Sequence, residues 1–282
     1  MRLIALAAAL APLLTAQHGW SDWKYEDRET MNRTFKVAAG DNASKLLVDN
    51  INGYLHVAGG TGSEIQVKVE KHIRAESQSD LDRAKKDVTL DMSQEGNAVK
   101  LYENGPFRTR DGVSWSSDRY HYSVTFDCDI QVPSGAQLEL KELNGAIEVK
   151  NSSGNFNVHT LNGKIDMQEI AGSGSVKSLN GAVKVAFMRN PAAESSFDTL
   201  NGPIDIYFQP SLNADIAFKT LHGGVYTDFD VTTVPTVIKG EGSGTRFIYR
   251  TGGDMKVRAG TGGPALSFRT LNGAIRLHSK TA

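Results

Sequence analysis

Two acidic side chains, Glu148 and Asp166, occupy the same place in successive copies of a short repeat. If these copies stack as neighbouring strands, about 4.8 Å separates the two residues. That spacing is close to the roughly 5 Å between the nucleophile and the acid/base of a retaining glycosidase. The same column continues with Lys184, Asp205, Tyr226 and Arg276. Mixed charges of this kind are more typical of a solvated face with weak ion pairs, so we expect no catalytic residue.

A second group of candidate residues lies in the segment from Asn104 to Arg119. Aromatic and arginine side chains are enriched at binding surfaces, and this segment holds Phe107, Arg108, Arg110, Trp115 and Arg119. We expect either an interaction loop or an ordinary hairpin connection whose tryptophan packs against the neighbouring strands.

The sequence predicts no metal site and no cofactor. The seven histidines lack zinc-ligand spacing. The glycine-rich run from Gly59 to Glu64 lacks the aspartate of a calcium-binding nonapeptide, and Gln66 stands where that motif has an apolar residue. The single cysteine, Cys128, falls on the apolar side of an alternating strand from Tyr120 to Val132, so we expect a core residue rather than a reactive thiol.

The elements that carry these residues are set by a repeated Leu-Asn-Gly motif. Its corner residues are Asn52, Gly53, Asn144, Gly145, Asn162, Gly163, Asn180, Gly181, Asn201, Gly202, Gly223, Asn272 and Gly273. His222 replaces the asparagine in one copy. From Gly145 to Gly223 the successive glycines are 18, 18, 21 and 21 residues apart. A period this short is that of one small coil of strands.

Aligned copies have apolar residues three positions before the leucine and two positions after the glycine. A lone Asn-Gly between apolar runs favours a hairpin, but equal columns at a fixed period favour coils stacked in parallel. We therefore predict an all-β fold, a right-handed β-helix or β-solenoid with coils of 18 to 21 residues. Neighbour contacts are expected in the order Leu143, Leu161, Leu179, Leu200 and Leu221.

The flanking segments complete the predicted organisation. Ser79 and Asp82 form a capping pair for a short helix at about 80–88. We expect a signal peptide at 1–16, a flexible segment at 17–32, a β-rich part at 33–135 that covers one end of the stack, and repeats at 136–282. The short apolar run of the signal peptide predicts no transmembrane segment after cleavage.

The chain resembles the bacterial putative-adhesin family of unknown function over roughly residues 33 to 280. The resemblance rests on Ile51-Asn52-Gly53, the helix near 80, Val132-Pro133-Ser134-Gly135, the Leu-Asn-Gly rungs and the final rung from Thr270 to Leu277. It implies an exported, envelope-associated protein with a right-handed single-stranded β-helix and no catalytic residues.

Composition narrows the possible partners. The chain has 282 residues, with 31 Lys and Arg against 32 Asp and Glu and a formal charge of -1, so no global positive field exists to bind nucleic acid. We expect a non-enzymatic, periplasmic or surface scaffold whose partner is an envelope or surface component, either protein or glycan. The alternatives are a carbohydrate-active enzyme using Glu148 and Asp166, and a self-assembling envelope filament. The oligomeric state stays open.

Overall fold

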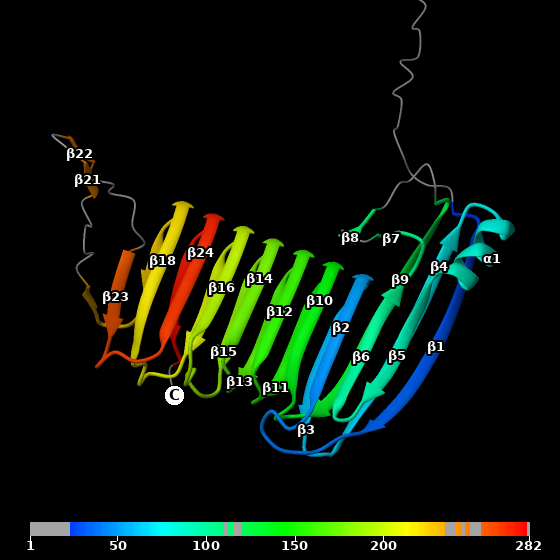
Figure 1. Cartoon of the computed structure of the whole chain (residues 1–282), viewed down its shortest axis with the longest axis horizontal. Coiled ribbons are helices and arrows are strands. Elements are labelled where there is room, and N and C mark those ends of the chain that lie inside the picture. The colour runs from blue at the N-terminus through cyan, green and yellow to red at the C-terminus, as the bar shows by residue number, and fades with distance from the viewer. Residues whose placement is uncertain are drawn as a thin grey trace, which may run out of the picture.

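The computed structural model describes residues 23–109, 112–114, 120–234, 241–243, 246–248 and 255–280. The expected signal peptide lies outside these residues, as do Arg110, Trp115 and Arg119. Within the described residues the chain is all-β apart from one helix, and the strands form two large sheets and two small hairpins. Figure 1 shows the long axis of the molecule running across the strands.

The first sheet has ten strands. In spatial order they are β1 (Tyr25–Lys36), β4 (Glu64–Ala75), β9 (Tyr122–Pro133), β3 (Leu55–Gly60), β11 (Ile147–Ser152), β13 (Ile165–Ile170), β15 (Val183–Phe187), β17 (Ile204–Phe208), β25 (Ile275–Ser279) and β19 (Val225–Thr227).

The second sheet has eleven strands. In spatial order they are β20 (Val231–Thr233), β23 (Met255–Ala259), β18 (Ala214–His222), β24 (Ala265–Asn272), β16 (Ser195–Asn201), β14 (Gly174–Asn180), β12 (Phe156–Asn162), β10 (Gln137–Asn144), β2 (Lys45–Asn52), β6 (Ala98–Asn104) and β5 (Thr89–Glu95). The hairpins are β7 (Arg108–Thr109) with β8 (Gly112–Val113), and β21 (Glu241–Ser243) with β22 (Arg246–Ile248).

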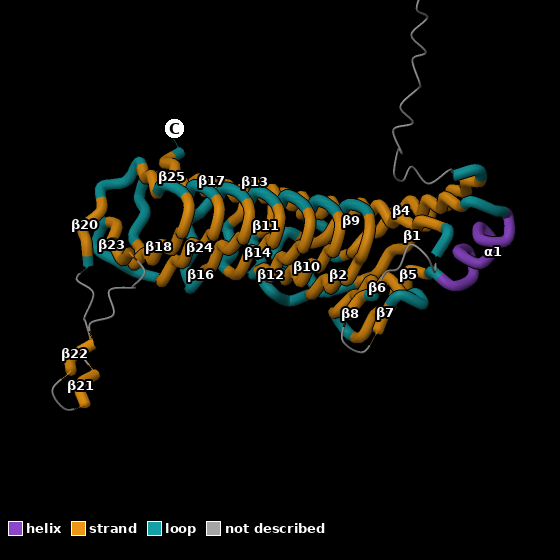
Figure 2. The backbone as a smooth tube through the Cα atoms, turned by 90° about the horizontal axis from the view of Figure 1, so that it is seen from above, coloured by secondary structure: helices purple, strands orange, loops and turns teal. Residues whose placement is uncertain are grey.

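The chain alternates between the two sheets at each Asn-Gly corner, as Figure 2 shows. β10 runs parallel to β12 with Leu140 beside Val158, and β11 runs parallel to β13 with Ile147 beside Ile165. The apolar columns of the sequence therefore stack like over like and face one another across the two sheets. The two strands that meet at a corner do not pair with each other as an antiparallel hairpin, because they belong to different sheets. Each strand pairs instead with the equivalent strand of the next coil, and this stacking removes the apolar face of the coil from water.

The order of the last rungs differs from the expected one. β24 lies between β16 and β18, so Leu271 comes between Leu200 and Leu221. In this order Asn272 continues the asparagine column beside Asn201, and its side-chain amide donates to Asn201 Oδ1 at 2.7 Å. The copy with His222 takes the place beside the antiparallel β23, where no further asparagine has to be matched.

Aromatic stacking fills the core of these last rungs. Phe268 stacks on Phe197 at 5.2 Å and on Phe218 at 5.5 Å between ring centroids. All three rings are buried, so the inserted β24 supplies the middle ring of a continuous column. Offset aromatic pairs of this kind add about 0.5 to 1.5 kcal/mol each to the free energy of burial.

The N-terminal part is more regular than expected. Residues 25–32, expected to be flexible, belong to β1, which pairs antiparallel with β4 along its whole length. The expected boundary between 135 and 136 does not divide the fold, because β2 and β3 pair in parallel with β10 and β11. Strand pairing therefore includes residues 25–32, and it joins strands that come before residue 135 to strands that come after it.

The helix α1 (Gln78–Asp87) begins two residues earlier than expected. Ser77, not Ser79, is its N-cap, and the Ser77 hydroxyl accepts from the Asp80 amide at 3.1 Å. The helix buries Leu81 and Ala84 and packs on β1, β4 and β9 at one end of the molecule (Figure 1).

Candidate functional site

The Asn-Gly corners form a ladder of side-chain amides along one edge of the molecule. Each asparagine donates its amide to the Oδ1 of the asparagine on the neighbouring rung. The donor–acceptor pairs are Asn144 to Asn52 at 3.0 Å, Asn162 to Asn144 at 2.8 Å, Asn180 to Asn162 at 2.8 Å, Asn201 to Asn180 at 2.8 Å and Asn272 to Asn201 at 2.7 Å. The structure therefore brings the predicted corner asparagines together as one hydrogen-bonded row.

The corner glycines are required by close stacking rather than by backbone conformation. A Cβ on Gly163 would lie 1.9 Å from the carbonyl oxygen of Gly145, and one on Gly145 would lie 1.6 Å from that of Gly53. Of the corner glycines only Gly53 has a left-handed φ, at 140°. This differs from the usual reason for Asn-Gly, which is positive φ in a hairpin turn.

A column of hydroxyl groups lies just inside the ladder, and the sequence analysis missed it. The residue before each motif leucine donates its hydroxyl to the corner glycine carbonyl of a neighbouring rung. The pairs are Thr160 to Gly145 at 3.1 Å, Ser178 to Gly163 at 3.0 Å, Thr199 to Gly181 at 2.9 Å, Thr270 to Gly202 at 3.1 Å and Thr220 to Gly273 at 3.3 Å. The signal was present, since a Ser or Thr precedes the leucine in these copies.

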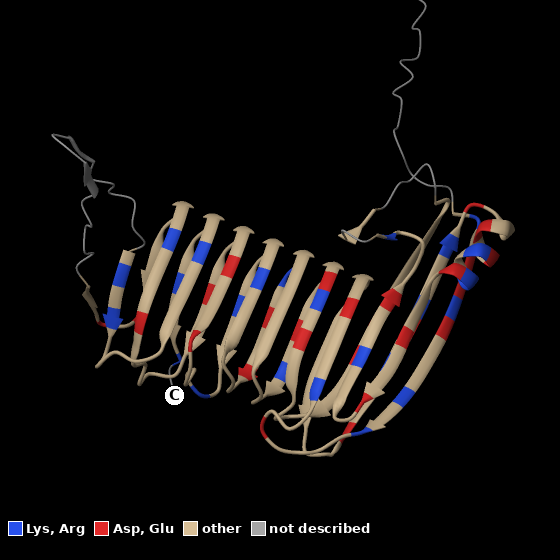
Figure 3. Cartoon of the chain, in the orientation of Figure 1, with Lys and Arg blue, Asp and Glu red and all other residues tan. Residues whose placement is uncertain are grey.

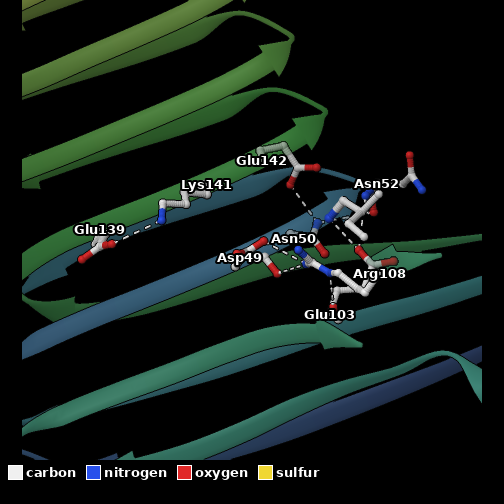
Figure 4. A network of polar contacts seen from close by, with 9 residues as sticks. Asp49, Asn50, Asn52, Glu103, Arg108, Glu139, Lys141 and Glu142 are labelled. Atoms are coloured by element: carbon white, nitrogen blue, oxygen red, sulfur yellow. Dashed lines mark hydrogen bonds and ion pairs between the residues drawn. The ribbon is translucent and has the colours of Figure 1, made fainter. Parts of the chain in front are cut away.

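The same column changes its chemistry in the first rungs, where it holds Glu103, Asn50 and Glu142 (Figure 4). All three are buried, with exposed fractions of 4% or less. The Asn50 amide donates to the Phe126 carbonyl at 3.1 Å and to Glu142 Oε2 at 2.8 Å. Glu103 Oε2 accepts from the backbone amide of Ile51 at 2.6 Å. We call these three residues the acid–amide cluster.

Both carboxyl groups of the acid–amide cluster hold protons more tightly than usual. Burial raises the pKa of Glu103 to about 7, although the backbone amides of Ile51 and Asn52 oppose the shift. Burial also raises the pKa of Glu142 to about 8, against the hydrogen bond from Asn50 and with a further contribution from Glu103. Glu103 Oε1, Glu142 Oε1 and Asn50 Oδ1 have no hydrogen-bond partner among the described residues. A proton on either acid would supply the donor that a hydroxyl supplies elsewhere in the column.

The described part of the expected interaction loop is anchored to the fold. Arg108 Nη2 lies 2.8 Å from Asp49 Oδ1, and Arg108 Nε donates to the Glu103 carbonyl at 2.8 Å. Its guanidinium lies 4.4 Å from the centre of the Tyr102 ring. Phe107 is 1% exposed and packs edge-to-face on Tyr120. Phe107 is therefore a core residue, and Arg108 is held by its contacts with Asp49, Tyr102 and Glu103.

The hollows on the N-terminal half include the following two. One, of about 410 Å³, is lined by Trp23, Tyr120, Tyr122, Leu143 and Asn144 among others. The second, of about 420 Å³, includes Arg33, His56, Lys68 and Asp129. Glu148 and Asp166 line neither hollow.

The structure places Glu148 beside Asp166 on adjacent strands, and each carboxylate has its own polar partner. Glu148 Oε1 lies 3.0 Å from Lys164 Nζ, and this hydrogen bond holds the Glu148 pKa below its usual value. Asp166 Oδ1 accepts from the Gln168 amide at 3.2 Å. A glycosidase general acid needs a raised pKa, so Glu148 has the opposite electrostatics.

Two further features of the described residues bear on function. None of their helices is long and apolar enough to cross a membrane. In the same part of the chain, no three His, Cys, Asp or Glu side chains are grouped so that they could hold a metal ion.

No protein-family model and no curated protein matches this chain. Solved structures similar to it include three that are each 12% identical. A putative cell adhesion protein from Clostridium sporogenes ATCC 15579 has a TM-score of 0.44, covering 89% of this chain and 100% of that chain. A putative adhesin from Bacteroides fragilis NCTC 9343 has a TM-score of 0.37, covering 88% and 97%. A putative lipid binding protein from Parabacteroides distasonis ATCC 8503 has a TM-score of 0.28, covering 88% and 96%. These neighbours include putative adhesins, the family that the sequence resembles, but such distant likenesses transfer no ligand and no residue role.

Proposed function

We propose that this protein is an exported, non-enzymatic scaffold of the cell envelope, adhesin-like, whose repeats form a right-handed β-helix. It presents flat, laddered faces to an envelope or surface component. The observation that carries this proposal is the register of the parallel strands, which places asparagine over asparagine along one edge over successive rungs. A flat periodic surface suits an extended or repetitive partner better than a small substrate.

Several features support the finer parts of the proposal. Parallel strands joined by crossovers are nearly always right-handed, which favours that hand for the coil. The apolar run before Gln17 favours export to the periplasm or surface. The ion pair between Glu148 and Lys164 disfavours Glu148 as the general acid of the glycosidase alternative, because it keeps Glu148 ionised.

Binding to isolated bacterial envelopes tests the proposal. Purified protein is incubated with washed envelopes from a Gram-negative bacterium and sedimented over a range of concentrations. We expect saturable binding and no release of reducing sugar, and the E148A/D166A variant should bind as the parent does. Absence of binding would overturn the scaffold role. Release of sugar by the parent that is lost in this variant would instead establish the enzyme.

A further inference from the structure

The motif leucines face outward and form a continuous apolar edge beside the amide ladder. In spatial order they are Leu143, Leu161, Leu179, Leu200, Leu271 and Leu221. We call this column the leucine edge. Leu200, Leu271 and Leu221 are 38%, 37% and 67% exposed, and the other three are half-buried. Six leucines at the strand spacing extend over about 24 Å. A sustained, partly exposed apolar column is a mark of an interaction site.

A row of cations runs parallel to the leucine edge on the same face of the second sheet. It consists of the residues two positions before each leucine, which are Lys141, His159, Lys177, Asp198, Arg269 and Lys219. We call it the cation row. Figure 3 shows blue segments at matching heights on β14, β24 and β18, with a red segment on β16 among them.

The cation row carries a net positive charge. Its cations are Lys141, Lys177, Arg269 and Lys219, against the single Asp198, which lies between Lys177 and Arg269 and interacts with both. Lys177, Arg269 and Lys219 are exposed, and no ion pair within 4.0 Å is formed by any of them among the described residues. Lys141 differs, because it lies 3.5 Å from Glu139. Burial, together with the charges of Lys177 and Lys141, lowers the pKa of His159.

The other flank of the leucine edge is almost uncharged. It is the amide ladder, in which most donors and acceptors already satisfy one another. Beyond the corner glycines stand Ala146, Lys164, Ala182, Pro203 and Ala274. Moving this flank out of bulk water therefore costs less than moving isolated amides would, because its hydrogen bonds are retained.

We propose that the leucine edge inserts into the interfacial layer of an anionic lipid membrane while the cation row lies at its phosphate groups. This inference rests on the proposed envelope function and names the partner surface. Residues two apart on a strand are separated by about 6.6 Å, which places cations at the headgroups when leucines reach about 5 to 10 Å into the boundary. Each Lys or Arg near an anionic leaflet adds about 1 kcal/mol, equivalent to roughly fivefold in affinity.

The charges and side-chain types decide between a lipid surface and other occupants. A second copy of this chain docked through the same face would bring two cation rows together, which is unfavourable. An acidic glycan would match the charges, but aliphatic leucines lack the ring faces that aromatic residues offer for stacking. The outer face of the first sheet has alternating charges such as Asp166, Lys184 and Asp205, so it offers neither feature.

Flotation with vesicles tests the inference. Purified protein is mixed with vesicles of phosphatidylglycerol and phosphatidylethanolamine, or of phosphatidylcholine alone, at low and high salt. We expect binding to the anionic vesicles that weakens as salt rises. K177Q/R269Q/K219Q should weaken it about a hundredfold, and L200S/L271S/L221S by about tenfold or more. The control K150Q/K184Q/R276Q removes the same charge from the first-sheet face and should change binding by less than about threefold. Melting temperatures establish that each variant is folded.

Several outcomes would overturn the inference. These are equal binding to phosphatidylcholine vesicles, an equal loss in the control variant, or a leucine variant that is folded and binds as the parent does. Tight binding to a lipid-free acidic polysaccharide that the leucine substitutions leave unchanged would identify a glycan partner instead. Binding to envelopes without binding to anionic vesicles would overturn the lipid inference and leave the scaffold role standing. Failure to bind either would overturn both.

Discussion

The side-chain amide of Asn50 lies 2.8 Å from Glu142 Oε2, and both residues are buried at the first corner of the stack. Asn50 also donates to the Phe126 carbonyl, as Thr160 does to the Gly145 carbonyl two rungs along. Glu142 occupies the same column, but a carboxylate has no proton to donate. The fold therefore favours the protonated acid at this position, in agreement with its raised pKa.

The acid–amide cluster predicts that stability falls as the pH rises from about 5 to 8. The native pKa values of about 7 for Glu103 and about 8 for Glu142 lie above the ordinary value of 4.5, so the native state binds more protons than the unfolded state. The stabilisation is fully present below about pH 4.5 and is lost as the pH passes through the native values, at about 1.4 kcal/mol per pKa unit. Thermal unfolding at constant ionic strength measures this slope.

Substitution assigns that slope to the cluster. E142Q keeps the shape of the side chain without a titrating group, so we expect a flatter pH dependence and a higher melting temperature than the parent at pH 8. The control is E139Q on the same strand, where the ion pair with Lys45 lowers the Glu139 pKa. A melting temperature that rises between pH 5 and 8 would contradict the assignment.

The hydroxyl column predicts a large cost for an isosteric change at Thr199. T199V removes the donor to the Gly181 carbonyl, which then stays buried without that hydrogen bond. We expect a loss of about 1 to 3 kcal/mol in the free energy of unfolding. T199S should recover most of it, and S196A, on the outer side of the same strand, should cost less than about 0.5 kcal/mol. Denaturant unfolding gives the values, and equal costs for the Thr199 and Ser196 substitutions would refute a specific role for this hydrogen bond.

The close approach of the corners predicts that G163A is strongly destabilising. The added methyl group would meet the Gly145 carbonyl, so the two rungs must separate. We expect a loss of about 3 kcal/mol or more, within the range for overpacked backbone sites. G62A is the control, because its Cβ would meet only the Glu64 amide nitrogen at 3.9 Å. A small effect of G163A in urea unfolding would mean that the corners can separate without cost.

The break in the amide ladder predicts a stabilising substitution. His222 is in register with Asn272, at the rung where the ladder ends. H222N places an amide where it can hydrogen-bond to Asn272, and we expect a gain of up to about 1 kcal/mol. H222A serves as the control that removes the imidazole without adding an amide. A melting temperature for H222N no higher than that of H222A would show that the ladder adds no stability there.

The sequence predicted only part of the chemistry of the candidate site. The pairing of Glu148 with Asp166 follows from the period of the repeat, whereas the ion pair that lowers the Glu148 pKa joins Lys164 from the turn before β13. The sequence did not indicate that Glu103 and Glu142 belong to one cluster. They are 39 positions apart, and each lies in an ordinary strand pattern. Their adjacency to Asn50 arises only when β6, β2 and β10 lie side by side.

The repeat alone determined that coils must stack in parallel with like residues over like, because the apolar columns have no other way to leave water. The order of the coils was decided only by the tertiary structure. The chain bypasses one place and returns through β24 to fill it, because Phe268 stacks there on both Phe197 and Phe218 and Asn272 hydrogen-bonds to Asn201. The order of the copies along the chain does not predict this position of β24. Each copy has nearly the same local pattern, so only the side chains packed against it in the folded protein determine its place in the stack.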